Sequence, residues 1–123
     1  GKIMNLGAVK GKTIPKMTII SKPLSKGMIN TRTFIPHKCH QSIGVFGAIS
    51  VATACLLEGT PANNLAVIPG GEKKICSIEH PSGQMQVSVE LRNKKIKSTA
   101  IVRTARKLFD GLVFPDQNSL KAS

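Results

Sequence analysis

Residues 37–61, HKCHQSIGVFGAISVATACLLEGTP, decide the fold of this chain. Within them, residues 43–57 carry no charge and only two hydroxyls, Ser50 and Thr53. A helix that is apolar on every side belongs in a protein interior. At 1.5 Å per residue these positions measure roughly 22 Å, which is short of the ~30 Å hydrocarbon core of a bilayer. We therefore predict a buried core helix rather than a membrane span.

The flanks of this segment predict where the helix begins and ends. Ser42 is a suitable N-cap. Gly59 can adopt the left-handed conformation that ends helices, and Pro61 cannot continue one. Gly44, Ala48 and Ala52 are four residues apart, so we expect one stripe of small residues where a strand approaches closely.

The composition indicates one globular domain. The chain has 123 residues, of which 41% are hydrophobic, enough to bury a core without disulfides. Three cysteines, an odd number, without a signal peptide or a glycosylation sequon, favour a reducing cytoplasm over secretion. We therefore predict a cytoplasmic protein.

The charge is strongly positive, +12 in total, and unevenly placed. Eight cations and no carboxylate precede Glu58. One interpretation is a solvated basic surface; the other is attraction of an anion, either a polyphosphate backbone or a small polycarboxylate. With four Phe and no Trp or Tyr, the chain offers little for bases to stack on, which weakens a single-stranded nucleic-acid interpretation.

Along the chain, residues 1–15 look like a linker, residues 16–115 form the domain, and residues 116–123 are a polar tail. Pro36 breaks the chain before the helix. Strands are expected at residues 16–22, 28–35, 65–68, 73–80, 84–92, 96–106 and 112–114. One early helix and many short strands at hairpin spacing predict an α+β domain, in which an antiparallel β-roll wraps one buried central helix.

Two of these strands carry patterns that predict their burial. Residues 84–92 alternate, and the apolar face consists of Met85, Val87, Val89 and Leu91. This alternation is typical of a half-buried antiparallel strand. The apolar centre of the next strand, at residues 100–102, is expected to be buried on both faces.

The start of the helix is a candidate anion site. Free backbone N–H groups and a partial positive charge occur at helix N-termini, which suits carboxylate or phosphate. The candidate binding residues are His37, Lys38, Ser42, Ile43 and Gly44. The alternative is that Ser42 only caps the helix and Gly44 only packs.

A second candidate is Ser82–Gly83, which follows His80–Pro81. Such a sequence is also typical of a simple hairpin turn. His80 is expected to share a strand face with Cys76 and Ile78.

The cysteines and histidines do not predict a metal site. Their spacing lacks the Cys-x2-Cys and His-x3-His pairs of structural zinc sites. Cys39 is a candidate nucleophile or proton carrier, because the positive end of a nearby helix would lower the pKa of its thiol. Cys55, inside the apolar helix, is assigned to packing.

Four segments in order carry a family resemblance: PKMTIISKP, HKCHQSIGVFGAISVATA, IEHPSGQMQVSVE and IVRTARKLFDGLVFP. Over about residues 15–115, the chain resembles the C-terminal half of the 2-methylaconitate cis-trans isomerase family, which includes methylitaconate isomerases and 4-oxalomesaconate tautomerases. The most specific segments are residues 80–83, HPSG, and 103–106, RTAR, followed by Asp110–Gly111. The resemblance implies a diaminopimelate-epimerase-like fold of two halves, with the active site between them.

This sequence also departs from the family's pattern. Relatives usually have a threonine where this chain has Ile43, and Ser42 is the nearest hydroxyl. Epimerases of this fold have a catalytic cysteine where Gln41 stands, so their two-cysteine mechanism does not transfer. The resemblance places the proton-handling Lys and Cys of the isomerases on the N-terminal half.

The predicted function is therefore that of a half enzyme. It would belong to a cofactor-independent isomerase or tautomerase that moves or reorients a C=C bond in an unsaturated di- or tricarboxylate by allylic proton transfer. This half would bind a substrate carboxylate, with the N-terminal half as partner and without nucleic acid or membrane; a homo-oligomer is left open. The alternatives are a small basic nucleic-acid-binding protein and a non-catalytic interaction domain.

Overall fold

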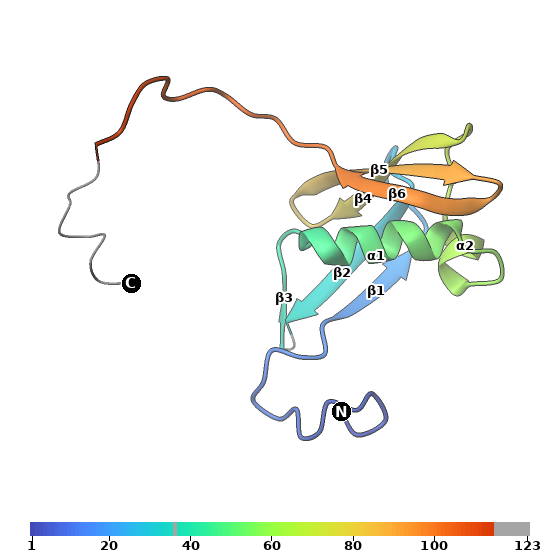
Figure 1. The fold of residues 1–123 in the computed structure, drawn as a ribbon. Coiled ribbons are helices and arrows are strands. Elements are labelled where there is room, and N and C mark those ends of the chain that lie inside the picture. Colours follow the sequence, from blue (N-terminus) through green and yellow to red (C-terminus); the bar gives the residue numbers. More distant parts are fainter. Residues whose placement is uncertain (36, 115–123) are drawn as a thin grey trace.

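The computed structural model describes residues 1–35 and 37–114. The expected Pro36 break and the polar tail at residues 116–123 lie outside the described residues. The elements are β1 (Met17–Ser21), β2 (Ile29–Ile35), β3 (Lys38–Cys39), α1 (Val45–Leu56), α2 (Pro61–Leu65), β4 (Lys73–His80), β5 (Gly83–Arg92) and β6 (Lys95–Ile101) (Figure 1). The predicted α+β class is confirmed.

The strands form one curved sheet in the order β1-β2-β4-β5-β6, and β3 pairs with the end of β2. Every pairing is antiparallel except that of β2 with β4, where Ile29 lies opposite Ile78 in a parallel register. The prediction of a wholly antiparallel sheet is therefore wrong at this pair. The physical reason is the connection between the two strands. The chain leaves β2, forms α1 and α2, and returns to the same end of the sheet to start β4, and such a long crossover allows two neighbouring strands to be parallel.

The hydrophobic core lies between α1 and the concave side of the sheet (Figure 1). Strand β5 confirms its predicted alternation, since Met85, Val87 and Val89 are buried and Gln84 and Gln86 are exposed. The helix contributes its fully buried small side chains, namely Ala48, Ala52 and Cys55. The assignment of Cys55 to packing is confirmed, and burial, with a smaller contribution from Cys76, raises the pKa of its thiol to about 11.

The helix is not enclosed on all sides by the described residues. Phe46 is 84% exposed, and Val45 and Ser50 are exposed as well. The sheet is open, with β1 and β6 as its edges, and the described strands leave the helix positions Val45, Phe46 and Ser50 uncovered. The expectation that the strands wrap a completely buried helix is wrong for this part of the chain.

The helix begins later than predicted. Gly44 is the N-cap, and its carbonyl accepts the first helical hydrogen bond from the Ala48 N–H at 2.9 Å. The prediction that Ser42 is the cap is wrong, because the buried Ile43 side chain anchors the chain in the core before the helix starts.

The helix ends at Leu56, and a second helix follows. Gly59 has the expected left-handed conformation, with φ at +81°. Thr60 then caps α2 by accepting a hydrogen bond from the Asn63 N–H at 3.1 Å, and Pro61 occupies the first helical turn. The strand predicted at residues 65–68 is wrong: Leu65 is the last residue of α2, which a capping threonine followed by proline starts, and residues 66–68 are neither helix nor strand. Neither helix, within the part of the chain that the structure describes, is long and apolar enough to cross a membrane.

The end of the domain is less regular than predicted. Strand β6 stops at Ile101, so the strand expected at residues 96–106 is too long. Residues 102–114 contain no strand, so the strand expected at residues 112–114 is wrong. Ala100 and Val102 are exposed rather than buried. The reason is that β6 is an edge strand with β5 as its partner.

A buried carboxylate fixes the loop between β1 and β2. The Glu79 side chain is 5% exposed, and its oxygens accept hydrogen bonds from the backbone N–H groups of Leu24, Ser25 and Gly27 at 2.7, 2.9 and 2.9 Å. Burial alone would raise the pKa of this carboxyl group, but the three hydrogen bonds outweigh burial and lower it. Glu79 therefore holds the loop against the end of β4, next to His80.

Candidate functional site

The two segments that the sequence singled out as anion sites meet in the structure. The turn between β4 and β5 lies against the loop that leads into α1. The backbone N–H of Ser82 donates to the Gln41 carbonyl at 3.0 Å, and the Ser82 hydroxyl donates to the same oxygen at 2.7 Å. Gly83 makes this turn possible, because its φ of +144° is disfavoured for other residues. These two hydrogen bonds hold the β4–β5 turn against the loop before α1, although Gln41 and Ser82 are far apart in the sequence.

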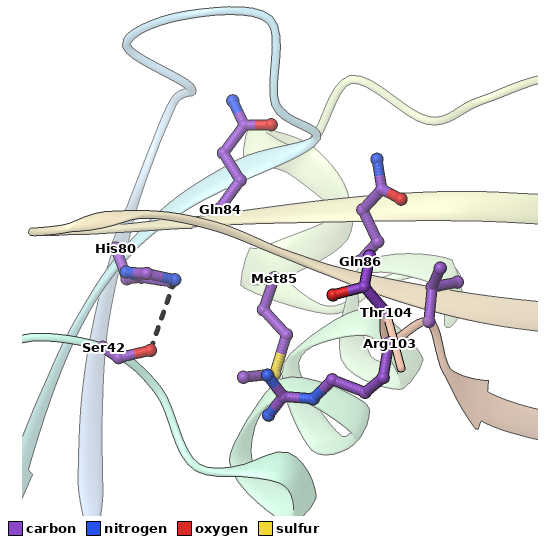
Figure 2. A pocket seen from close by; sticks show the side chains of 8 residues that line it. Ser42, His80, Gln84, Met85, Gln86, Arg103 and Thr104 are labelled. Carbon is purple, nitrogen blue, oxygen red and sulfur yellow. Dashed lines mark hydrogen bonds between the residues drawn. The ribbon is translucent and has the colours of Figure 1, made fainter. Parts of the chain in front are cut away.

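His80 connects the two segments. Its Nε2 lies 3.3 Å from the Ser42 hydroxyl (Figure 2), and its Nδ1 lies 3.3 Å from the Ser82 hydroxyl. Burial is the main cause that lowers the pKa of His80; the Gln41 carbonyl raises it and the charge of His40 lowers it further. The imidazole is therefore neutral at neutral pH.

A cavity of about 400 Å³ opens beside this histidine. Figure 2 shows that its walls come from the α1 entry loop, from β5 and from the segment after β6. The Arg103 side chain supplies a cation, and Ser42, His80, Gln84 and Gln86 supply groups that form hydrogen bonds. The remaining lining residues are Met85, Val102 and Thr104.

A second cavity, of about 340 Å³, lies on the other side of the β4–β5 turn and shares His80 and Gln84 with the first. Arg32 lines it and donates to the Asn30 side chain at 3.0 Å and to the Thr31 carbonyl at 2.8 Å. His80 therefore lines two cavities that each contain an arginine, an arrangement that favours an anion over a cation.

The N-terminus of α1 faces a third cavity, of about 300 Å³. As in any helix, the first backbone N–H groups lack partners within the helix. No side chain of the described residues caps them, and a Cβ added to Gly44 would meet no atom within 4 Å. Lys16 and His40 also line this cavity. The helix end is therefore uncapped and accessible, and anion binding there stays a prediction; it does not share the cavity that contains His80.

The other candidate residues are more scattered. His37 is exposed, as are Lys38 and Cys39 on β3, where Lys38 pairs with Ile35. The Ile43 side chain is buried, so only its backbone could contact a ligand. Within residues 1–35 and 37–114, no cluster of three or more His, Cys, Asp or Glu side chains is arranged to hold a metal ion.

The predicted binding set does not include four polar residues on which the cavities depend, namely Arg32, His80, Gln84 and Arg103. Two of them lie in the motifs on which the family resemblance rests, HPSG and RTAR. In the HPSG motif, Ser82 and Gly83 account for the turn, but the turn alone does not account for His80. Motif membership was therefore the signal that could have identified these two.

The fold and the site together define an α+β domain in which two cavities beside His80 are each lined by an arginine. The chain belongs to the PrpF protein family, whose profile matches residues 1–116.

Curated relatives agree with this assignment. The 4-oxalomesaconate tautomerase of Pseudomonas putida is 54% identical over 113 residues, which are 92% of this chain and 31% of that protein. The (4E)-oxalomesaconate Delta-isomerase of a Novosphingobium species is 50% identical over 93% of this chain and 32% of that protein. The protein named putative isomerase YbhH of Escherichia coli is 39% identical over 93% of this chain and 33% of that protein. This chain thus spans about a third of the length of these relatives.

The solved structures include a similar fold. A crystal structure of methylitaconate-delta-isomerase superimposes with a TM-score of 0.69 at 21% sequence identity, over 93% of this chain and 33% of that one. This likeness supports the fold alone.

Proposed function

We propose that this chain is the substrate-carboxylate-binding part of an isomerase or tautomerase that acts on an unsaturated di- or tricarboxylate. The observation that carries the proposal is the 54% identity to a protein named 4-oxalomesaconate tautomerase, spread over nearly the whole chain. Three cavities support it chemically, because each contains a group that favours carboxylate oxygens: Arg103 in the first, Arg32 in the second and the open start of α1 in the third. The relatives give no support to the nucleic-acid-binding and interaction-domain alternatives.

The proposed division of labour assigns binding to this chain and proton transfer to the remainder of a longer protein. The support is length, because the relatives are about three times as long as the matched region. Allylic proton transfer needs a base and an acid at the reacting carbon. It also needs fixed positive charge where a dienolate-like intermediate gathers negative charge. In this proposal no cofactor takes part. The binding residues would come from His37, Lys38, Ser42, Ile43, Gly44, Ser82 and Gly83.

Three finer expectations belong to the same proposal. Residues 16–115 would be one half of a diaminopimelate-epimerase-like β-roll, with residues 1–15 as the entry to the domain. The curved sheet with two open edges supports this proposal. A cytoplasmic location and a homo-oligomer stay predictions.

The test is solvent exchange in the natural-length protein, by which we mean a protein of the relatives' full length that contains this chain. In deuterated water, we expect deuterium to enter the allylic position of oxalomesaconate or methylitaconate. NMR detects this exchange. The chain of residues 1–123 alone is expected to give no exchange, because the proposal places the base and the acid on the remainder of the longer protein. Exchange by this chain alone that disappears in Cys39→Ser would contradict the division of labour.

Ser82→Ala is expected to reduce turnover in the natural-length protein. The Ser82 hydroxyl donates to the Gln41 carbonyl at 2.7 Å and lies 3.3 Å from Nδ1 of His80, and leaving such polar groups unpaired costs on the order of 1–3 kcal/mol. The measurement is kcat/KM, with Ser98→Ala as the matched control, since the exposed Ser98 hydroxyl bonds to Glu90 on β5. Unchanged kinetics in Ser82→Ala would assign this turn a purely structural role.

A further inference from the structure

The hydrogen bonds around His80 fix which of its nitrogens carries a proton. The Gln41 carbonyl can only accept, so the Ser82 hydroxyl uses its single proton in the 2.7 Å bond to that oxygen. Toward His80, 3.3 Å away, the same hydroxyl can then only accept. These contacts assign the proton of the neutral ring to Nδ1 of His80.

The other nitrogen is consequently an acceptor. A neutral imidazole carries one proton, so Nε2 is bare and accepts from the Ser42 hydroxyl at 3.3 Å. Figure 2 shows the Ser42 side chain beside His80 at the cavity. In this tautomer the Ser42 proton is directed at His80, and only the oxygen lone pairs of Ser42 are available to a ligand. Such a hydroxyl repels a carboxylate instead of binding it.

Protonation of His80 reverses the direction of this bond. A proton taken from solvent onto the Nε2 lone pair creates a second N–H, which donates to the Ser42 oxygen. The Ser42 O–H bond is not broken, but it rotates away and becomes a donor toward the cavity. The same event places a positive charge on the ring. A carboxylate would gain both a hydrogen bond and an attractive charge.

We propose that His80 is the positioning residue for the Ser42 hydroxyl, and that a carboxylate entering this cavity binds together with one proton, taken up at His80 Nε2. This inference rests on the proposed function, because it takes the ligand to be a polycarboxylate. It adds to that function a residue outside the predicted binding set and a proton that accompanies binding.

The charged groups around His80 explain why the proton arrives with the ligand. Arg32 on β2, Arg103 after β6 and His40 in the entry loop are cationic or titratable, and they oppose a further positive charge in the empty cleft. Glu79, next to His80 on β4, is the nearby carboxylate, but both of its oxygens are held by backbone N–H groups. A bound carboxylate supplies the missing negative charge.

The expected consequence is a pH-dependent affinity. The pKa of His80 is lowered in the free protein by burial, and a neighbouring carboxylate raises it in the complex. Below the pKa of the free protein, affinity is constant. Between the two pKa values the dissociation constant rises by up to about tenfold per pH unit, as expected for one linked proton, and above the pKa of the complex it levels off.

The experiment uses the natural-length protein and tricarballylate, a saturated tricarboxylate that cannot isomerise. Nitrogen-15 NMR of the histidine rings should show His80 as the Nδ1–H tautomer, and tricarballylate should raise its pKa. Calorimetry in two buffers of different ionisation enthalpy should show uptake of about one proton between the two pKa values. His80→Gln should bind with an affinity that no longer changes over this range.

Two variants test the role of the serines. Ser82→Ala removes the acceptor for Nδ1–H and should shift the tautomer toward Nε2–H, while Ser98→Ala should not. An Nε2–H tautomer in the unsubstituted protein, a lack of tricarballylate binding, or binding without proton uptake would each overturn the inference. Proton-linked binding in a protein that isomerises no polycarboxylate would instead refute the proposed function alone.

Discussion

Glu79→Gln is expected to lower the free energy of unfolding by about 2–4 kcal/mol, given that hydrogen bonds to a charged group contribute ~1.5–3 kcal/mol each. The carboxylate accepts three backbone N–H bonds from the loop before β2, and it is buried. An amide has only one acceptor oxygen, and its NH₂ group would face at least one backbone donor. The measurement is urea unfolding of the natural-length protein, followed by circular dichroism.

Glu90→Gln is the matched control. Glu90 is a more exposed glutamate on β5 that pairs with Lys97 at 2.8 Å, and solvent screens this pair. We expect Glu90→Gln to change the unfolding midpoint little. Equal effects of the two substitutions would show that the Glu79 hydrogen bonds contribute no special stability.

The same carboxyl group predicts how stability responds to acid. Because the folded pKa of Glu79 lies below its ordinary value of ~4.3, the ionised form contributes stability that is present above that pH. This stability is lost as the pH falls through the folded pKa. The unsubstituted protein should therefore lose stability below about pH 4, and Glu79→Gln should lack this part of the loss. Parallel acid profiles of the two proteins would contradict the assignment.

Gly44→Asp is expected to abolish polycarboxylate binding by the natural-length protein without unfolding it. Gly44 is the N-cap of α1 with extended backbone angles, φ −68° and ψ 152°, and a Cβ there meets open space. Asp is a preferred N-cap residue, so its carboxylate would accept the free N–H groups of the first turn. It would thereby occupy the donors and cancel the positive potential that we propose for substrate binding. Calorimetry with tricarballylate measures the loss.

Gly44→Asn separates charge from capping. Its amide oxygen can cap the helix about as well, but it adds no negative charge. We expect this variant to keep part of the affinity and to have the same thermal stability as Gly44→Asp or slightly less. If Gly44→Asp bound tricarballylate as tightly as the unsubstituted protein, the helix end would not be the anion site.

Sequence alone predicted the elements whose signals are local. Strand β4 and the alternation of β5 were predicted within a residue, because period-2 patterning and turn residues are properties of short segments. The apolar run at residues 43–57 predicted α1 to within two residues. Helix α2 had a local signal as well, Thr60 followed by Pro61, which was assigned to the end of one helix and not to the start of another.

Tertiary structure decided the features that depend on distant partners. The parallel pairing of β2 with β4, the open face of α1 and the exposure of β6 follow from the order of strands in the sheet, which no short pattern specifies. The site is the clearest case. Ser42 and Ser82 could each be identified as a candidate, but only the fold brings both hydroxyls to one imidazole and directs their protons. Hydrogen bonds act over about 3 Å in space, whatever the separation along the chain.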